Sequence, residues 1–463
     1  MSSFEHLRLP SVSDAELGTI KSLLTQWEAR LSRNLQRTVY YDGEQAFKDL
    51  GLMLPHRLRS ARFYLGWATM AVRKAAIRSQ FDGLRLPGVA DPFDLGVTLE
   101  ANAFPLEFSQ AVMSAYKHGV SFVTVAGDSS IGAQIQAHSA ETATAIWDAR
   151  TRSVASALTI SELDDEGKPS AFLVYLPGAV LTCERSGGSW SVDRQAVRLP
   201  RVPVVPVTYD PQITAPFGRS RISRPVMALT DMAVRAYVRM EGNAEFYSSP
   251  QLAVEGIDPD AFDNATEQRK FKLAMDRLVA LSRDADGNAP TIKQLQQATM
   301  TPHSDMLRTV AMAFSGETGI PPSSLGIIHD NPSSAEAIRA AEHDLLIDVQ
   351  YQNKFVLSSA VKQIATFAVM ARDNLTEAPA DAWRLSSRFV DPEFRSASAA
   401  ADAVMKLSAH PKLQSSSVPL EMVFDQEQLE RIESDSRRVH SASVLDRLTA
   451  RGANDDTGAA AEA

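Results

Sequence analysis

The chain has 463 residues, enough for two or three domains with a sizeable core, and its 44% hydrophobic and 22% charged residues are ordinary for a globular protein. Its net charge of −9 argues against a protein that grips nucleic acid across its whole surface, so any contact with DNA is expected to be local or loose. The single cysteine, Cys183, excludes an intramolecular disulfide and a Cys-based zinc site, and is expected in the core.

Two further absences bear on where the protein works. The sequence holds no run of about 18 apolar residues, the length that spans a bilayer. The amino terminus, MSSFEHLRLP, lacks the basic-then-apolar pattern of a signal peptide. Together they predict a protein that is made and stays in the cytoplasm, with no membrane partner.

The first part of the chain is expected to be helical. Ser13 and Glu16 form a capping box, which predicts a helix over residues 13–39. An aromatic pair and a turn follow at residues 40–43. A second helix, with a basic and solvated face, is expected over residues 59–78, with its end at residues 81–83.

The middle of the chain changes from helix to strand. Proline at its start and glycine after its end predict a helix over residues 105–118, and alternation predicts a strand over residues 120–126. Polar turns then separate short strands of an antiparallel meander, expected over residues 153–161, 170–175, 180–184 and 189–193. Residues 200–211 hold four prolines and are expected to be an extended connector and the first domain boundary.

Two helices and a small excursion between them are expected next. The first helix covers residues 217–247, with Pro225 tolerated in its first turn. Between residues 219 and 239 five arginines outnumber the single acidic residue, Asp231, and an ordinary solvated face is the alternative to a functional role. The arginines are Arg219, Arg221, Arg224, Arg235 and Arg239. Residues 250–302 form the excursion, with a hairpin of residues 278–283 and 291–295, and the second helix covers residues 304–315.

The strongest local signals lie between residues 301 and 370. A proline-rich loop, residues 320–332, precedes a second capping box formed by Ser333 and Glu336. From residue 334 to residue 372 no Gly or Pro interrupts the chain, so one very long helix is expected, with a single apolar stripe that includes Leu345 and Phe367. Composition alone favours a simple connection for the loop.

The last part of the chain is expected to hold shorter helices and a tail. The helices are placed at residues 395–407, 419–424 and 426–440. The final stretch, RGANDDTGAAAEA, is expected to be disordered because it lacks apolar residues of any size.

Enzyme motifs have little support. The chain has no phosphate-binding G-x-x-x-x-G-K-[ST], no G-x-S-x-G and no H-E-x-x-H, so no catalytic residue, metal or cofactor is expected. The turn at residues 284–288 does not fit a calcium loop, because its glycine and its carboxylates are at the wrong positions. Asp260, Glu267 and Lys270 suggest a nuclease cluster only weakly, since their spacing is that of a helix.

Several segments resemble the portal proteins of tailed bacteriophages, specifically those of phages that infect actinobacteria and related hosts. The most specific are G-E-T-G-I-P-P-S-S-L-G at residues 316–326 and D-N-P-S-S-A-E-A-I-R-A-A-E at residues 330–342. F-G-R-S-x-I at residues 217–222 and Y-Y-x-G at residues 40–43 agree with them. The resemblance covers the chain from residue 40 to about residue 407.

This resemblance implies an α+β fold, mainly helical, with long stem and wing helices, an antiparallel β-meander in the wing and a small α/β clip. It divides the chain into seven parts: a wing part (1–216), a first stem helix (217–249), the clip (250–302), a second stem helix (303–317), a channel loop with a long wing helix (318–378), a crown-like helical region (379–450) and a disordered tail (451–463).

The resemblance also implies a function and its partners. Portal proteins form a homo-oligomeric ring, a dodecamer in the assembled head, at one capsid vertex. Double-stranded DNA passes through the ring, driven by the terminase large subunit, and the ring contacts the head-tail adaptor and the major capsid and scaffold proteins. The protein is therefore expected in the virion, after assembly in the host cytoplasm. The alternative is a metal-dependent, nuclease-like DNA-processing enzyme of a phage or prophage.

Within the ring, the resemblance assigns one segment to the DNA channel. The channel loop consists of Ile327, Ile328, His329, Asp330, Asn331 and Pro332, and it carries no permanent cation. Since Lys or Arg there would bind phosphates in a salt-dependent way, a neutral-to-acidic loop lets DNA slide. The stem arginines are then expected to be partners between subunits, although one ring of them facing the channel stays open.

Overall fold

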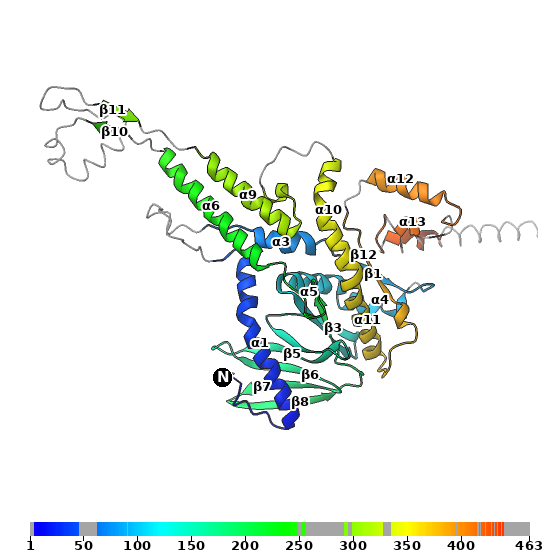
Figure 1. Cartoon of the computed structure of the whole chain (residues 1–463). Coiled ribbons are helices and arrows are strands. Elements are labelled where there is room, and N and C mark those ends of the chain that lie inside the picture. Colours follow the sequence, from blue (N-terminus) through cyan, green and yellow to red (C-terminus); the bar gives the residue numbers. More distant parts are fainter. Residues whose placement is uncertain are drawn as a thin grey trace, which may run out of the picture.

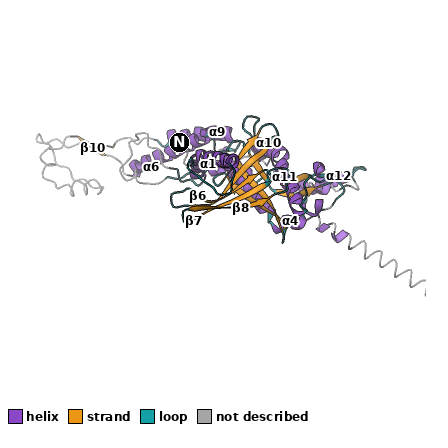
Figure 2. Ribbon diagram, turned by 90° about the horizontal axis from the view of Figure 1, so that it is seen from below, coloured by secondary structure: helices purple, strands orange, loops and turns teal. Residues whose placement is uncertain are grey.

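The computed structural model describes residues 4–45, 63–89, 91–248, 252–255, 291–294, 299–326, 335–393 and 397–413, with short runs between 416 and 438. A body of two sheets and several helices lies at the centre (Figure 1). Two helices, α6 and α9, project from it on one side, and α12 and α13 lie on the other, which Figure 2 shows from below. The mixture of helices with antiparallel sheets agrees with the α+β class.

The first helix, α1 (Asp14–Tyr41), begins at the capping box that the sequence predicts: the Ser13 side chain accepts from the Glu16 backbone and Glu16 accepts from the Ser13 backbone. Its buried face joins a core cluster with the outer sheet. Trp27 Nε1 donates to the carbonyl oxygen of Glu141 at 2.7 Å, which fixes the helix against the edge of that sheet.

The outer sheet is an antiparallel meander of five strands in chain order: β4 (Ala143–Asp148), β5 (Ser153–Leu163), β6 (Pro169–Leu176), β7 (Ala179–Ser186) and β8 (Ser189–Ala196). Four of the five match the predicted strands. Cys183 lies buried on β7, and burial raises the pKa of its thiol to about 12, which makes it an unreactive core residue, as expected.

The inner sheet has the order β3-β2-β9, formed by β2 (Val120–Asp128), β3 (Gly132–Ser139) and β9 (Val204–Thr208). Strand β2 is buried on both faces: Val123 and Val125 join the main core with the helices, while Val120 and Phe122 join the cluster shared with the outer sheet. Helices α5 (Phe104–His118) and α11 (Ser358–Arg372) pack against it.

Residues 200–211 are extended as predicted over residues 204–208, but they are not simply a connector, because these residues form β9 and pair with β2. Within the described sheet β9 has β2 as its one neighbour, so Pro206, which lacks an N–H, can lie on this edge strand without leaving a second neighbouring strand unpaired.

The end of the second helix is also corrected. Helix α3 covers Trp67–Ala76, and β1 (Phe81–Arg85) is not a helix end but a strand that pairs with β12 (Ser386–Phe389); residues 46–62 lie outside the described part.

Smaller elements complete the body. A 3-10 turn (Pro92–Asp94) and α4 (Gly96–Ala101) precede α5, and a second 3-10 turn (Ala382–Arg384) precedes β12. Arg388 on β12 pairs with Asp82 on β1 at 2.7 Å, so the carboxyl-terminal part is tied to the first half of the chain. Helices α12 (Ala397–Ser408) and α13 (Val418–Glu421) match predicted helices to within a few residues, and residues 451–463 lie outside the described part.

The projecting pair consists of α6 (Arg224–Ser248) and α9 (Thr301–Thr318), which pack side by side. Beyond them β10 (Leu252–Glu255) pairs antiparallel with β11 (Thr291–Gln294), which matches the strand predicted at 291–295. The other predicted strand of the hairpin, 278–283, lies within residues 256–290, outside the described part. Helix α6 begins seven residues later than predicted, because residues 217–223 bind the body in a non-helical form.

The long helix runs through α10 (Ala335–Tyr351), a π-helical segment (Gln352–Leu357) and α11. The predicted continuity is confirmed, but the π segment interrupts the α geometry and buries Gln352 and Asn353, whereas Tyr351 and Phe355 are exposed. By length and composition alone, Ala340–Arg372 could cross a membrane, yet its second half packs on the inner sheet as a core helix does.

Candidate functional site

The predicted channel loop, Ile327–Pro332, lies outside the described residues, as do Ser333 and the nuclease candidates Asp260, Glu267 and Lys270. The structure does describe the frame of the loop. On one side α9 ends at Gly319, where φ is +69°, and a 3-10 turn (Pro322–Leu325) follows; on the other side α10 begins. The site is therefore described by what holds the two ends of the loop.

Arg221 joins these two ends. Its Nε donates to the carbonyl oxygen of Ala71 on α3 at 2.7 Å, and its Nη2 donates to the carbonyl oxygen of Thr318, the last residue of α9, at 2.6 Å. Its Nη1 donates to the hydroxyl of Tyr209 at 2.9 Å and forms an ion pair with Asp348 on α10. We call these five residues the Arg221 cluster. The fork of donors on one guanidinium thus connects three helices.

Burial sets the electrostatics of the Arg221 cluster. Arg221 is only 7% exposed, and the hydroxyl of Tyr209 donates to Asp348 Oδ2 at 2.9 Å. Burial raises the pKa of Tyr209 far above its ordinary value, so the phenol stays protonated as a donor. The tilted ring of Tyr116 lies 4.6 Å from that of Tyr209, centroid to centroid, and packs against the cluster. The charges are compensated inside the chain.

The backbone before α6 explains the sequence F-G-R-S-x-I. Gly218 has φ of +68°, and a Cβ there would lie 2.1 Å from the carbonyl oxygen of Tyr209, so only glycine fits. The next amide, of Arg219, donates to that same oxygen at 2.8 Å, and the amide of Arg221 donates to the carbonyl oxygen of Tyr116 at 2.9 Å. The motif therefore positions Arg221, which periodicity could not reveal.

The five predicted stem arginines fall into different environments. Arg221 is an internal tie whose guanidinium nitrogens all have acceptors within the chain. Arg219 is exposed and donates to Gln212 Oε1 at 2.8 Å. Arg224 is exposed at the start of α6, while Arg235 and Arg239 are half-buried along α6, where Arg239 contacts Met306 of α9 at 3.4 Å. Four of the five thus remain near a surface.

A cavity of about 440 Å³ lies at the base of the loop, next to the Arg221 cluster. Its lining includes four carboxylates, which belong to Asp210, Glu317, Asp344 and Asp348, and two guanidiniums, those of Arg219 and Arg221. Within the described ranges, no three His, Cys, Asp or Glu side chains are grouped closely enough to hold a metal ion. The acidic lining extends the neutral-to-acidic character of the loop itself.

Three comparisons place the chain among known proteins. Residues 20–441 match the family described as phage portal protein, SPP1 Gp6-like. The portal protein of Mycobacterium phage L5 is 27% identical over 417 residues, covering 86% of this chain and 84% of that protein, and the portal protein of Mycobacterium phage D29 is 28% identical over 390 residues, covering 81% and 79%. A chain of the neck of a native GTA particle, computed with C12 symmetry, matches 77% of this chain and 89% of its own length at 12% identity and a TM-score of 0.39.

Proposed function

Because the chain belongs to the SPP1 Gp6-like family of phage portal proteins, we propose that it forms a ring at one capsid vertex, through which double-stranded DNA is packaged and later ejected. Family membership implies a dodecamer in the assembled head. Portal proteins are structural components of the virion, and we place assembly of this ring in the host cytoplasm. A nuclease-like enzyme is not favoured, since the family match covers nearly the whole chain.

An exposed apolar face on the long helix supports ring formation. Ile347, Tyr351 and Phe355 follow one another at four-residue spacing and are 51%, 55% and 58% exposed. The rings of Tyr351 and Phe355 lie 5.2 Å apart, and the Lys354 ammonium lies 5.4 Å from the centre of the Phe355 ring. Single exposed apolar residues are normal, but an aligned row is typical of a surface that contacts another protein. In a head-to-tail ring this row would meet a different surface of the neighbouring subunit.

The projecting helix pair supports the division into stem and clip. Helices α6 and α9 leave the body together, and the short β10–β11 ladder continues beyond them (Figure 1). In the proposed ring, residues 217–249 and 303–317 are the stem, 250–302 the clip, 318–378 the channel loop with the wing helix, and 379–450 the crown-like region. The clip, at the far end of the pair, would dock the terminase large subunit and the head-tail adaptor. The wing, residues 1–216, would contact major capsid and scaffold proteins.

The channel assignment rests on the family resemblance, and the structural observation that supports it is the Arg221 cluster. It holds the end of α9 and the middle of α10 against α3, so the two helices that frame the loop are fixed relative to each other. Residues 327–332 would then face DNA without a permanent cation, which lets the duplex slide.

A charge change in the loop tests this function. Asp330→Lys combined with Asn331→Lys is expected to slow or stall DNA packaging while leaving rings intact, because twelve copies would each add phosphate contacts. The defect should lessen as salt rises and screens the added charges. Ser161→Lys combined with Asp165→Lys, two exposed positions at the end of β5 and in the following turn, makes the same change of charge as a control. Parental packaging rates at low salt for the loop variant would refute the assignment.

A further inference from the structure

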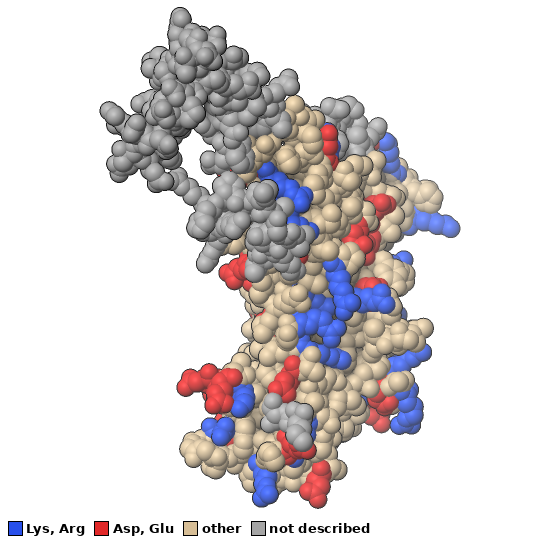
Figure 3. Space-filling view, turned by 60° about the vertical axis from the view of Figure 1, so that its left-hand side comes forward, with Lys and Arg blue, Asp and Glu red and all other residues tan. Residues whose placement is uncertain are grey.

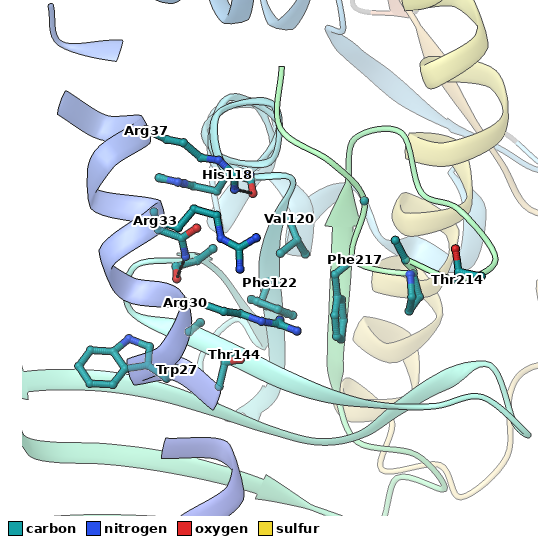
Figure 4. Close-up of a pocket in the computed structure, with 16 residues that line it drawn as sticks. Trp27, Arg30, Arg33, Arg37, His118, Val120, Phe122, Thr144, Thr214 and Phe217 are labelled. Atoms are coloured by element: carbon teal, nitrogen blue, oxygen red, sulfur yellow. Dashed lines mark hydrogen bonds between the residues drawn. The ribbon is translucent and has the colours of Figure 1, made fainter. Parts of the chain in front are cut away.

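A cavity of about 300 Å³ lies between α1, the start of β2, β4 and residues 214–218 (Figure 4), and no residue of α6 or α9 lines it. One helix supplies its charged wall: Arg30, Arg33 and Arg37 follow at spacings of three and four residues and therefore share a face of α1. We call these three the Arg30–Arg37 cluster. Lys and Arg also gather at mid-height on the face shown in Figure 3. The remaining walls include Trp27, His118, Phe122, Thr144 and Phe217.

The positive charge in this cavity is not compensated. None of the residues that line it is Asp or Glu, and in the described part of the chain neither Arg30 nor Arg33 forms an ion pair. Arg37 only donates from Nη1 to the carbonyl oxygen of His118, at 2.6 Å. The Glu141 carboxylate, which is not part of the lining, already accepts from Thr38 and lies 3.8 Å from Lys117 Nζ. Three guanidiniums thus share one cavity without an anion.

Two observations show that this arrangement of guanidiniums is energetically unfavourable. Burial, and then the charge of Arg33, lowers the pKa of Arg37 to about 10 and lowers that of Arg30 as well. Arg37 Nε and His118 Nδ1 are buried and have no hydrogen-bond partner among the described residues. A buried donor without a partner, such as the Arg37 Nε–H, destabilises the fold, and an anion in the cavity would offset that cost.

The shape of the cavity limits what can enter. Its volume is at the lower end of the range of small-molecule sites, roughly 300–1,000 Å³. The Arg30 guanidinium lies over the Phe217 ring, 5.7 Å from its centre, which orients its donors toward the interior. A tetrahedral oxyanion can accept from several guanidinium forks at once, since its oxygens point in different directions.

We propose that this cavity is a binding site for a phosphate group, held by Arg30, Arg33 and Arg37. The site is independent of the channel and needs no ring, because all the residues that form it belong to one chain. Its ligand is either free inorganic phosphate or the terminal phosphate of a small ester such as a mononucleotide, for which the aromatic walls offer apolar contacts.

Calorimetry on the purified full-length protein tests the proposal, with inorganic phosphate as the probe and sodium chloride at matched ionic strength as the reference. The parent protein is expected to bind phosphate saturably. Arg30→Gln and Arg33→Gln should each weaken binding about tenfold or more, because each removes a charge-assisted hydrogen bond. Arg150→Gln, at an exposed position outside the cavity, is the matched control and should bind like the parent.

Three outcomes would overturn the proposal. The first is no saturable binding, and the second is equal binding by the parent, Arg30→Gln, Arg33→Gln and Arg150→Gln. The third is an adventitious ion only, in which phosphate raises the melting temperature no more in the parent than in Arg33→Gln. Repeating the titration with a mononucleotide distinguishes free phosphate from a phosphate ester. Tighter binding of the mononucleotide would show that the aromatic walls contact the rest of the ester. If short duplex DNA, but neither phosphate nor the mononucleotide, bound in a manner that depends on Arg30 and Arg33, the surface would be a nucleic-acid contact and the small-ligand site would be refuted.

Discussion

Arg221 and the Arg30–Arg37 cluster show two different uses of arginine in one chain. Arg221 is 7% exposed, and each of its three guanidinium nitrogens has an acceptor, including the carboxylate of Asp348. The Arg30–Arg37 cluster lies in a cavity with no carboxylate in its lining. A guanidinium whose donors all have acceptors in the chain stabilises the fold, whereas guanidiniums without a carboxylate partner keep donors that a ligand can use.

The comparison also assigns the two regions different tasks. The Arg221 cluster joins α3, α9 and α10, the helices that frame the proposed channel loop, so its loss should affect the whole fold. The Arg30–Arg37 cluster lies where α1 meets the sheets, so its loss should affect binding and leave the fold almost unchanged. Three predictions test this difference, from the largest expected effect to the smallest.

The largest effect is expected for Arg221→Met. It leaves Asp348 with only the Tyr209 hydroxyl and removes the donors to two buried carbonyl oxygens. Because the Asp348 side chain is 34% exposed, most of the loss comes from the carbonyl oxygens, and the free energy of unfolding should fall by about 2–4 kcal/mol. Urea denaturation measures this change. Arg219→Met, at an exposed neighbouring position, should change it by no more than about 0.5 kcal/mol.

A double variant sharpens the result. In Arg221→Met combined with Asp348→Leu no charge is left without its partner, so the loss should be smaller than the sum of the two single losses. Strict additivity would mean that Arg221 and Asp348 do not act as a pair.

An intermediate effect is expected from acid near the Arg30–Arg37 cluster. Burial, then the charges of Lys117 and Arg37, lowers the pKa of His118 to about 3, and burial lowers that of His138 to about 4. The unfolded chain protonates both imidazoles below about pH 6.5, while the folded chain does not. Stability conferred by the neutral imidazoles is thus complete above pH 6.5 and is lost as pH falls toward 4, by about 1.4 kcal/mol for each histidine at pH 5.5.

His118→Gln isolates one half of this effect. The variant should lose less stability than the parent between pH 7 and pH 5.5, measured by urea denaturation at both values. Glu141 Oε1 lies 3.4 Å from His118 Nε2 and would favour the charged form, but burial at 1% side-chain exposure outweighs it. Equal pH dependence of parent and variant would contradict this and mean that folding leaves the pKa of His118 unchanged, whereas a smaller loss in the parent than in the variant would mean that Glu141 keeps the imidazole charged.

The smallest effect is expected for Arg33→Gln. Arg33 is exposed and repels Arg30 and Arg37 on the same helix face, so its removal should raise the free energy of unfolding by about 0.5 kcal/mol in phosphate-free buffer. Arg150→Gln should leave it unchanged. A destabilisation of more than about 1 kcal/mol would show that Arg33 has a compensating partner and would remove the contrast with Arg221.

Elements with local signals could be predicted from the sequence. The capping box at Ser13 and Glu16 placed the start of α1, and alternation with polar turns placed β5, β6, β7 and β8. Gly119 and Pro105 bounded α5 to within one residue. In each case the deciding interaction, a cap or a turn, lies within a few residues of the chain.

Features that depend on distant partners could not be predicted. Residues 204–208 lie among prolines, and only pairing with β2 makes them a strand. From the sequence, Arg221 is expected to be a surface arginine of a stem helix. Its acceptors, such as Ala71 and Asp348, lie far away in the sequence, so no local pattern indicates that it is buried. The Arg30–Arg37 cluster could not be predicted, because the apolar periodicity of α1 identifies its buried face but not the elements that contact its polar face. The π segment has no local signal that we can identify.

The proposed channel residues, Ile327–Pro332, rest on the family resemblance, and the structure adds only their frame. The same holds for most of residues 250–302. The central claim is thus the ring itself, which the exposed row of Ile347, Tyr351 and Phe355 supports independently of both segments.

Electron microscopy of the purified protein in negative stain tests that claim most directly. The parent is expected to form rings with a central hole, with a subunit number that varies in the absence of a capsid. Tyr351→Asp combined with Phe355→Asp, which changes only exposed side chains, should keep the thermal stability of the single chain but lose the rings. Isolated 50.4 kDa chains of the parent at high concentration, without rings, would contradict the claim.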